Sequence, residues 1–168
     1  SDNTSGAGIQ ADLKTAQALG AYCLCSLTVV TSQNSKKVSK IFNVPNKILA
    51  SQLKSLSEEY KIDGVKIGLV NNLLSAGVIY NFLSKFRDKV PIVIDPIFQS
   101  SNNKKFVKVE NFIKINKKFS KLNPVFTPNF NEANLLIKKT KKEITIQKLF
   151  FLLNEKYNCK FVITGGDL

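Results

Sequence analysis

The stretch Pro91–Asp95 (PIVID) decides the fold, because it is apolar up to its last residue and ends on a carboxylate. A short run of β-branched residues behind a proline is typical of a buried strand. Similar runs occur at Tyr22–Thr31 (YCLCSLTVVT), Gly64–Val70 (GVKIGLV), Val125–Thr127 and Lys160–Thr164. The sequence therefore predicts five strands.

Segments with apolar residues at helical spacing lie between these strands. The predicted helices are Gly8–Leu19, Ile48–Tyr60, Leu73–Phe86, Val109–Phe119, Asn131–Lys138 and Ile146–Tyr157, the last capped by Thr145. Strands separated by helices form βαβ units, so we predict an α/β fold with a doubly wound, mostly parallel sheet and helices on both faces. Because no linker or repeat divides the chain, we expect residues 1–168 to form a single domain.

The charge is strongly basic, with 25 Lys and Arg against 12 Asp and Glu, and this raises the question of nucleic-acid binding. Only Arg87 is an arginine, although arginine is the residue that phosphate and base recognition favour. The lysines mostly fall between apolar residues, as they do on solvated helix faces. We therefore expect no nucleic-acid partner, while a catalytically inactive basic binding module remains an alternative.

Other residue counts exclude further classes. The chain has no His, which excludes Ser-His and Cys-His catalytic pairs. No apolar run approaches the roughly 20 residues of a membrane span, so no membrane association is expected. The three scattered cysteines favour a reducing, cytoplasmic setting over a disulfide framework. Cys23 and Cys25 are predicted to pack as thiols, because a metal site would need a second pair.

Polar residues follow the predicted strands, at the sheet edge where ligands of such folds bind. Asp95, Asn129 and Glu132 supply carboxylate and amide oxygens, which suit Mg²⁺ bridged to phosphates. The last predicted strand ends at Thr164, and Gly165 follows it. Taken singly, Asp95 and Asn129 are explained as caps of the next element, and only the grouping favours a phosphate or metal site.

The first residues, Ser1–Gly8 (SDNTSGAG), lead into a helix with small side chains that let a ligand approach the backbone. Asp12 lies early in that helix, where the helix dipole favours a carboxylate, and it could also accept a bond from an amino group. Gln33 follows a strand and carries a donor and an acceptor in one amide, which can pair with the edge of a heteroaromatic ring.

Six motifs arrive in an order that resembles the hydroxymethylpyrimidine/phosphomethylpyrimidine kinases of thiamine biosynthesis, in the ribokinase-like superfamily. They are SDNTSGAGIQADLKT (1–15), TVVTSQN (28–34), VKIGL (65–69), IVIDP (92–96), TPNFNEANLL (127–136) and VITGGDL (162–168). The resemblance implies a ribokinase-like kinase that uses ATP and Mg²⁺. Its small-molecule substrates would be 4-amino-5-hydroxymethyl-2-methylpyrimidine and then the monophosphate. Pyridoxal kinase, in the same superfamily, is the alternative, and a homodimer is one expected assembly.

The resemblance also assigns site residues. The pyrimidine pocket would comprise Gly6, Ala7, Asp12, Thr31, Gln33 and Leu69. The nucleotide would contact Asn129, Thr164, Gly165 and Gly166, and the metal would lie at Asp95 and Glu132.

The sequence departs from the family pattern at several positions. Glycine is usual where Ser5 stands, Met where Leu69 stands, and Lys and His where Thr164 and Asp167 stand. A strand that usually precedes the first motif is absent, as is a later Gly-rich, GTGC-like loop whose amides form an anion hole and whose Cys is the proposed base. We therefore expect a chain truncated at both ends that holds no catalytic residue, and that binds the pyrimidine weakly without turnover.

Overall fold

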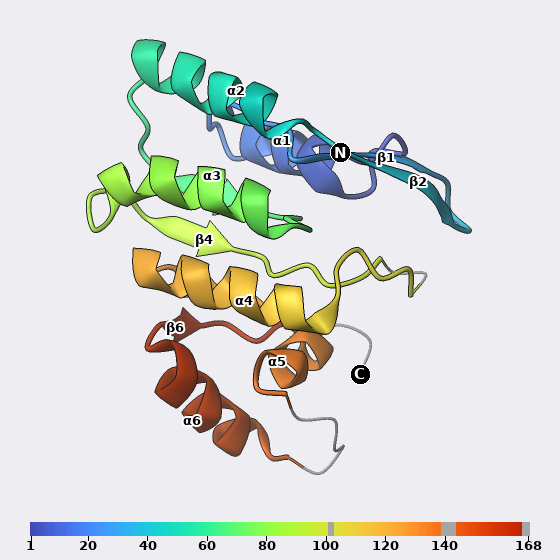
Figure 1. Cartoon of the computed structure of the whole chain (residues 1–168), viewed down its shortest axis with the longest axis vertical. Helices are drawn as coiled ribbons and strands as arrows, with labels where there is room; N and C mark the ends of the chain where they lie inside the picture. Colours follow the sequence, from blue (N-terminus) through green and yellow to red (C-terminus); the bar gives the residue numbers. More distant parts are fainter. Residues whose placement is uncertain (101–102, 139–143, 166–168) are drawn as a thin grey trace. The chain divides into compact units, whose positions relative to one another are not determined.

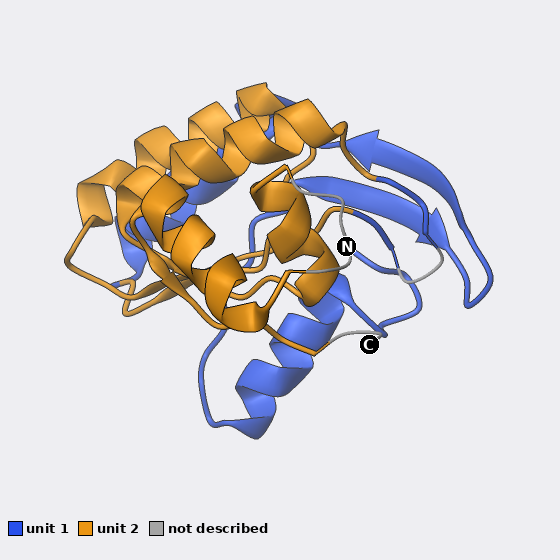
Figure 2. Ribbon diagram, turned by 90° about the horizontal axis from the view of Figure 1, so that it is seen from below, with its two compact units in different colours: residues 1–61, 99–105 blue, residues 62–98, 106–168 orange. Residues whose placement is uncertain are grey.

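The computed structural model describes residues 1–100, 103–138 and 144–165. The chain forms two compact units, residues 1–61 with 99–105 and residues 62–98 with 106–168 (Figure 2). No helix within the described ranges is long and apolar enough to cross a membrane.

The second unit is built on a four-stranded parallel sheet in the order β3-β4-β5-β6. The strands are β3 (Val65–Ile67), β4 (Ile92–Ile94), β5 (Val125–Phe126) and β6 (Lys160–Phe161). All four lie within predicted strands, which confirms the parallel α/β sheet. Neighbours in the sheet are also neighbours in sequence, so each crossover between them carries at least one helix.

These crossover helices pack in series, α3 against α4, α4 against α5, and α5 against α6 (Figure 1). Their bounds are α3 (Leu73–Leu83), α4 (Val109–Phe119), α5 (Phe130–Leu136) and α6 (Ile146–Tyr157), with 3-10 turns at Ser84–Phe86 and Ser120–Leu122. Phe112, Ile115 and Phe119 are buried because they recur along one face of α4. Each such side chain contributes about 1.5–3 kcal/mol when it is fully buried.

The helix ends follow local side-chain chemistry. Asn72 begins α3 by accepting a hydrogen bond from Ser75 N at 2.8 Å, and Thr145 begins α6 by accepting one from Lys148 N at 3.3 Å. Asn158 ends α6 in the left-handed conformation, which asparagine tolerates better than most residues. The predicted cap at Thr145 is therefore confirmed.

The described part of the first unit contains two helices and a hairpin. Its elements are α1 (Gly8–Ala18), β1 (Val29–Gln33), β2 (Val38–Asn43) and α2 (Asn46–Glu59). β1 and β2 pair antiparallel, and the Asn34 side chain closes the turn by accepting from Lys36 N and Lys37 N at 2.9 and 3.0 Å.

The predicted strand Tyr22–Thr31 is wrong in its extent. The strand begins only at Val29, and it pairs with β2, a strand that the sequence did not predict. Strand structure needs a partner backbone as well as apolar residues. Residue Leu27 instead donates its N–H to the Gln52 side chain at 2.7 Å.

Candidate functional site

The carboxyl ends of the parallel strands bring the predicted phosphate-site residues together in the second unit. Asp95 N donates to Ile67 O at 2.8 Å, which continues the β3–β4 ladder one residue past β4. Thr164 lies opposite Asn129 in a parallel bridge and donates its N–H to Pro128 O at 2.9 Å. The predicted edge is therefore formed by the chain turns that follow three neighbouring strands.

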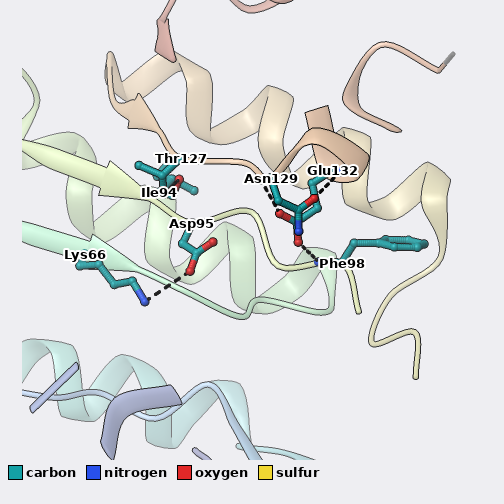
Figure 3. Close-up of polar contacts among 7 residues, drawn as sticks. All are labelled: Lys66, Ile94, Asp95, Phe98, Thr127, Asn129 and Glu132. Carbon is teal, nitrogen blue, oxygen red and sulfur yellow. Dashed lines mark hydrogen bonds and ion pairs between the residues drawn. The ribbon is translucent and has the colours of Figure 1, made fainter. Parts of the chain in front are cut away.

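Glu132 is the buried acid of this edge, and only 7% of the residue is exposed. Figure 3 shows its contacts with Asn129 and Phe98. Its Oε2 accepts from Asn129 N at 3.0 Å, and Asn129 Oδ1 accepts in return from Glu132 N at 2.9 Å. This reciprocal capping box starts α5. Glu132 Oε1 accepts from Phe98 N at 3.1 Å, so the carboxylate also holds the loop after β4.

Burial raises the pKa of Glu132 above its usual value, and the Asp95 carboxylate adds to the rise. The N–H groups of Asn129 and Phe98 act in the opposite direction, because they stabilise the ionised form. The net upward direction means that burial outweighs the two hydrogen bonds. A cation at this edge would favour the ionised form.

Asp95 is more accessible, and its Oδ2 lies 3.8 Å from the Lys66 ammonium on β3 (Figure 3). Among the described residues, no group of three His, Cys, Asp or Glu side chains could hold a metal by itself. Asp95 and Glu132 nonetheless fit Mg²⁺, which takes one or two carboxylates and completes its shell with water and phosphate oxygens.

The first unit centres on Asp2, a residue that the sequence reasoning did not select. Asp2 is 5% exposed, and its carboxylate accepts from Thr4 N at 2.8 Å, from Thr4 Oγ1 at 2.8 Å, and from Ala7 N at 2.9 Å. Burial acts to raise the pKa of Asp2, but hydrogen bonds from Thr4, Gln33 and Ala7 outweigh it and hold the pKa below its usual value. The carboxylate is therefore ionised at neutral pH.

Ser1 and Asn3, the residues on either side of Asp2, form hydrogen bonds with β1. Thr31 Oγ1 donates to Ser1 O at 2.8 Å. The Asn3 side chain accepts from Gln33 N at 2.8 Å and donates to Gln33 O at 3.0 Å. These contacts hold the Gln33 backbone beside Asn3, and the Gln33 side chain is one of the groups that lower the pKa of Asp2.

Four of the six predicted pocket residues thus gather around Asp2. They are Gly6, Ala7, Thr31 and Gln33. Asp12 lies half-buried on α1, and its charge contributes to raising the pKa of Cys25. Leu69 belongs to the second unit, two residues after β3.

Gly166 and Asp167 lie outside the described residues. Cys23 and Cys25 are half-buried free thiols, as predicted for packing residues. Cys25 contributes to a shallow groove of about 340 Å³ along α2 that includes none of the predicted pocket residues.

A family model described as phosphomethylpyrimidine kinase matches residues 2–168. The hydroxymethylpyrimidine/phosphomethylpyrimidine kinase of Aquifex aeolicus is 34% identical over 135 residues, which are 80% of this chain and 52% of that protein. The kinase of the same name from Haemophilus influenzae is 31% identical over 169 residues, which are 99% of this chain and 62% of that protein. The chain thus spans between about half and two thirds of these relatives' length.

Solved structures show the same fold. A crystal structure of phosphomethylpyrimidine kinase from Clostridium difficile matches with a TM-score of 0.85 and 30% identity, covering 100% of this chain and 73% of that one. An ADP complex of Bacillus subtilis pyridoxal kinase matches with a TM-score of 0.79 and 25% identity, covering 99% of this chain and 62% of that one.

Proposed function

Because this chain belongs to the phosphomethylpyrimidine kinase family, we propose that it carries the pyrimidine-binding and phosphate-binding parts of an ATP-dependent kinase. Its substrates are 4-amino-5-hydroxymethyl-2-methylpyrimidine and the corresponding monophosphate, in thiamine diphosphate biosynthesis. Curated relatives named for this kinase and for bifunctional thiamine biosynthesis support the proposal. The observation that carries it is the grouping of Gly6, Ala7, Thr31 and Gln33 around the buried Asp2 carboxylate.

In this proposal Asp2 orients the Gln33 amide. An ionised carboxylate only accepts hydrogen bonds, so the bond between the two side chains uses an N–H of Gln33. The amide keeps its oxygen as an acceptor and one further N–H as a donor. An aminopyrimidine offers a matching amino donor beside a ring-nitrogen acceptor, so both remaining groups of Gln33 are used.

The loop of Gly6 and Ala7 supplies the other side of the pyrimidine site in this proposal. The backbone N–H of Ala7 is already bound to Asp2, which holds the loop in place before a ligand arrives. A side-chain atom built on Gly6 would lie 3.6 Å from Thr4 Oγ1 and 3.7 Å from Asp2 Oδ2. The small residues there leave room for a flat ring to approach the backbone.

ATP and Mg²⁺ belong to the other unit in this proposal. Asp95 and Glu132 would hold the cation, and Asn129, Thr164, Gly165 and Gly166 would lie along the nucleotide. Bound Mg²⁺ would neutralise phosphate charge as it develops during transfer. The three cysteines are free thiols, which suits the reducing cytoplasm in which we place the reaction.

Pyridoxal is the alternative acceptor, since pyridoxal kinases share the fold. The two acceptors are distinguished by titrating each into the chain by calorimetry and by following phosphate transfer from [γ-³²P]ATP. We expect the pyrimidine to bind at least about tenfold more tightly than pyridoxal, with no transfer by the 168 residues, because no GTGC-like loop is present in them.

Tighter binding of pyridoxal would replace the pyrimidine assignment with the alternative. Ordinary turnover by the 168 residues would contradict the expectation that they hold no catalytic base. Binding of neither compound, together with RNA binding that collapses between low and physiological salt, would favour the basic binding module.

A further inference from the structure

Lys66 pairs with the Asp95 carboxylate at the phosphate edge. It stands in the VKIGL motif (65–69), and the resemblance assigned this lysine no role. It lies on β3 opposite Val93 of β4, and its ammonium reaches along the sheet to within 3.8 Å of Asp95 Oδ2 (Figure 3). The two side chains are 39% and 36% exposed. A ligand can therefore reach both groups.

Gly68 makes room for this ammonium. A Cβ atom built on Gly68 would lie only 3.3 Å from Lys66 Nζ, which is tighter than ordinary van der Waals contact. The backbone of Gly68 does not adopt the left-handed conformation that favours glycine. Glycine therefore matters at this position because it has no side chain, which leaves space for the ammonium.

The edge needs a positive charge if it is to accept phosphate. Asp95 and Glu132 are close enough for the charge of Asp95 to raise the pKa of Glu132, and a nucleotide brings further negative charge to the same place. The Lys66–Asp95 pair is solvent-exposed and contributes little to stability, so it breaks readily when either partner finds a stronger one.

Building on the proposed kinase function, we infer that Lys66 is a phosphate-binding residue. In the ligand-free chain its ammonium pairs with Asp95. When a divalent cation takes Asp95, the ammonium turns to a phosphate oxygen of the nucleotide. Lysine suits this exchange because it is a compact charge on a flexible stem.

The inference predicts opposite changes in two affinities when Lys66→Gln removes the charge. Mn²⁺ alone, followed by the EPR signal of the free ion, should bind more tightly, by about threefold or more, because a competing cation is gone. AMP-PCP with Mg²⁺, followed by calorimetry, should bind about tenfold more weakly, because a charge-assisted hydrogen bond is lost. Lys66→Arg keeps the charge and should restore most of the nucleotide affinity.

Lys54→Gln is the matched control, since Lys54 forms an exposed pair with Glu58 at 3.4 Å on α2. It should change neither affinity. If the unaltered chain binds both probes and Lys66→Gln leaves both affinities unchanged, or weakens both, the inference fails while the proposed function stands. If the unaltered chain binds neither probe, the phosphate site itself fails and the inference with it.

Discussion

The Glu132 carboxylate and the Phe98 backbone N–H form a buried hydrogen bond of 3.1 Å between positions 34 residues apart in the chain (Figure 3). Since the other carboxylate oxygen starts α5, one side chain fixes both turns that follow β4 and β5. Two positions of the proposed phosphate edge, Asp95 and Asn129, therefore depend on the same buried acid.

Glu132→Gln should change how stability varies with pH. Because the pKa of Glu132 is raised in the folded chain, its contribution is fully present below the unfolded value, near 4.5, and is lost as the pH rises through the folded value. The unaltered chain should thus lose stability relative to Glu132→Gln as the pH rises from 4.5, by at most about 1.4 kcal/mol per pH unit. Urea unfolding at several pH values measures this. The exposed Glu155→Gln controls for net charge, and a difference that grows in the opposite direction would refute the burial argument.

Asp2→Asn should destabilise the chain by about 2 kcal/mol at neutral pH, because an amide nitrogen then faces backbone and hydroxyl donors. The pKa of Asp2 is lowered, so its stabilisation is present above its usual value of 3.8 and is lost as the pH falls through the folded value. The deficit of Asp2→Asn should therefore shrink in acid. Glu58→Gln removes the same charge from an exposed pair and should cost no more than about 0.5 kcal/mol. Equal losses from both variants would contradict the central place of Asp2.

Ser5→Gly should stabilise the chain by about 0.5–1 kcal/mol, because Ser5 has a φ of 62°.

Gly8→Ala should destabilise the chain by about 2 kcal/mol, since Gly8 also has a positive φ and a Cβ there would lie 3.0 Å from Asp2 N. In α3, Gly77→Ala meets no atom within 4 Å, and it should stabilise the chain by about 0.5–1 kcal/mol. Thermal unfolding ranks the three variants, and a stabilising Gly8→Ala would contradict the close approach of Gly8 to Asp2 N.

Cys25 should react slowly with iodoacetamide. Burial, with the neighbouring Cys23, raises the pKa of its thiol to about 11, and the thiolate is the reactive form. At pH 8 the rate should be on the order of 100-fold below that of an unperturbed thiol, and it should keep rising up to about pH 11. Peptide mapping by mass spectrometry gives the rate at this site. A rate that levels off near pH 9 would contradict the assignment.

The sequence predicted the second unit better than the first. The bounds of α4 and α6 agree with the predictions at both ends, because buried residues such as Phe112 and Leu153 recur at helical spacing. β2 was missed because most of its residues face solvent, and its pattern of Ser39, Lys40 and Ile41 is not strand-like. The signal that would have found it is the turn at Asn34 between two apolar runs.

The sequence predicted most residues of the candidate site, but it did not predict the hydrogen bonds that hold them in place. Asp95, Asn129 and Glu132 were grouped because they follow strands that end at one edge. Asp2 was not selected, because an acid among Ser, Thr and Gly reads as an ordinary loop residue until its donors are visible. The pyrimidine at Gln33 and the Mg²⁺ at Asp95 stay predictions, because both are separate molecules that bind to the chain.

The most direct test is a calorimetric titration of 4-amino-5-hydroxymethyl-2-methylpyrimidine into the chain and into Gln33→Ala, with the neighbouring exposed Ser32→Ala as control. One site per chain should be seen, weakened at least about tenfold in Gln33→Ala because two hydrogen bonds to the ring are lost, and unchanged in Ser32→Ala. Equal affinity for the unaltered chain and Gln33→Ala would contradict the account.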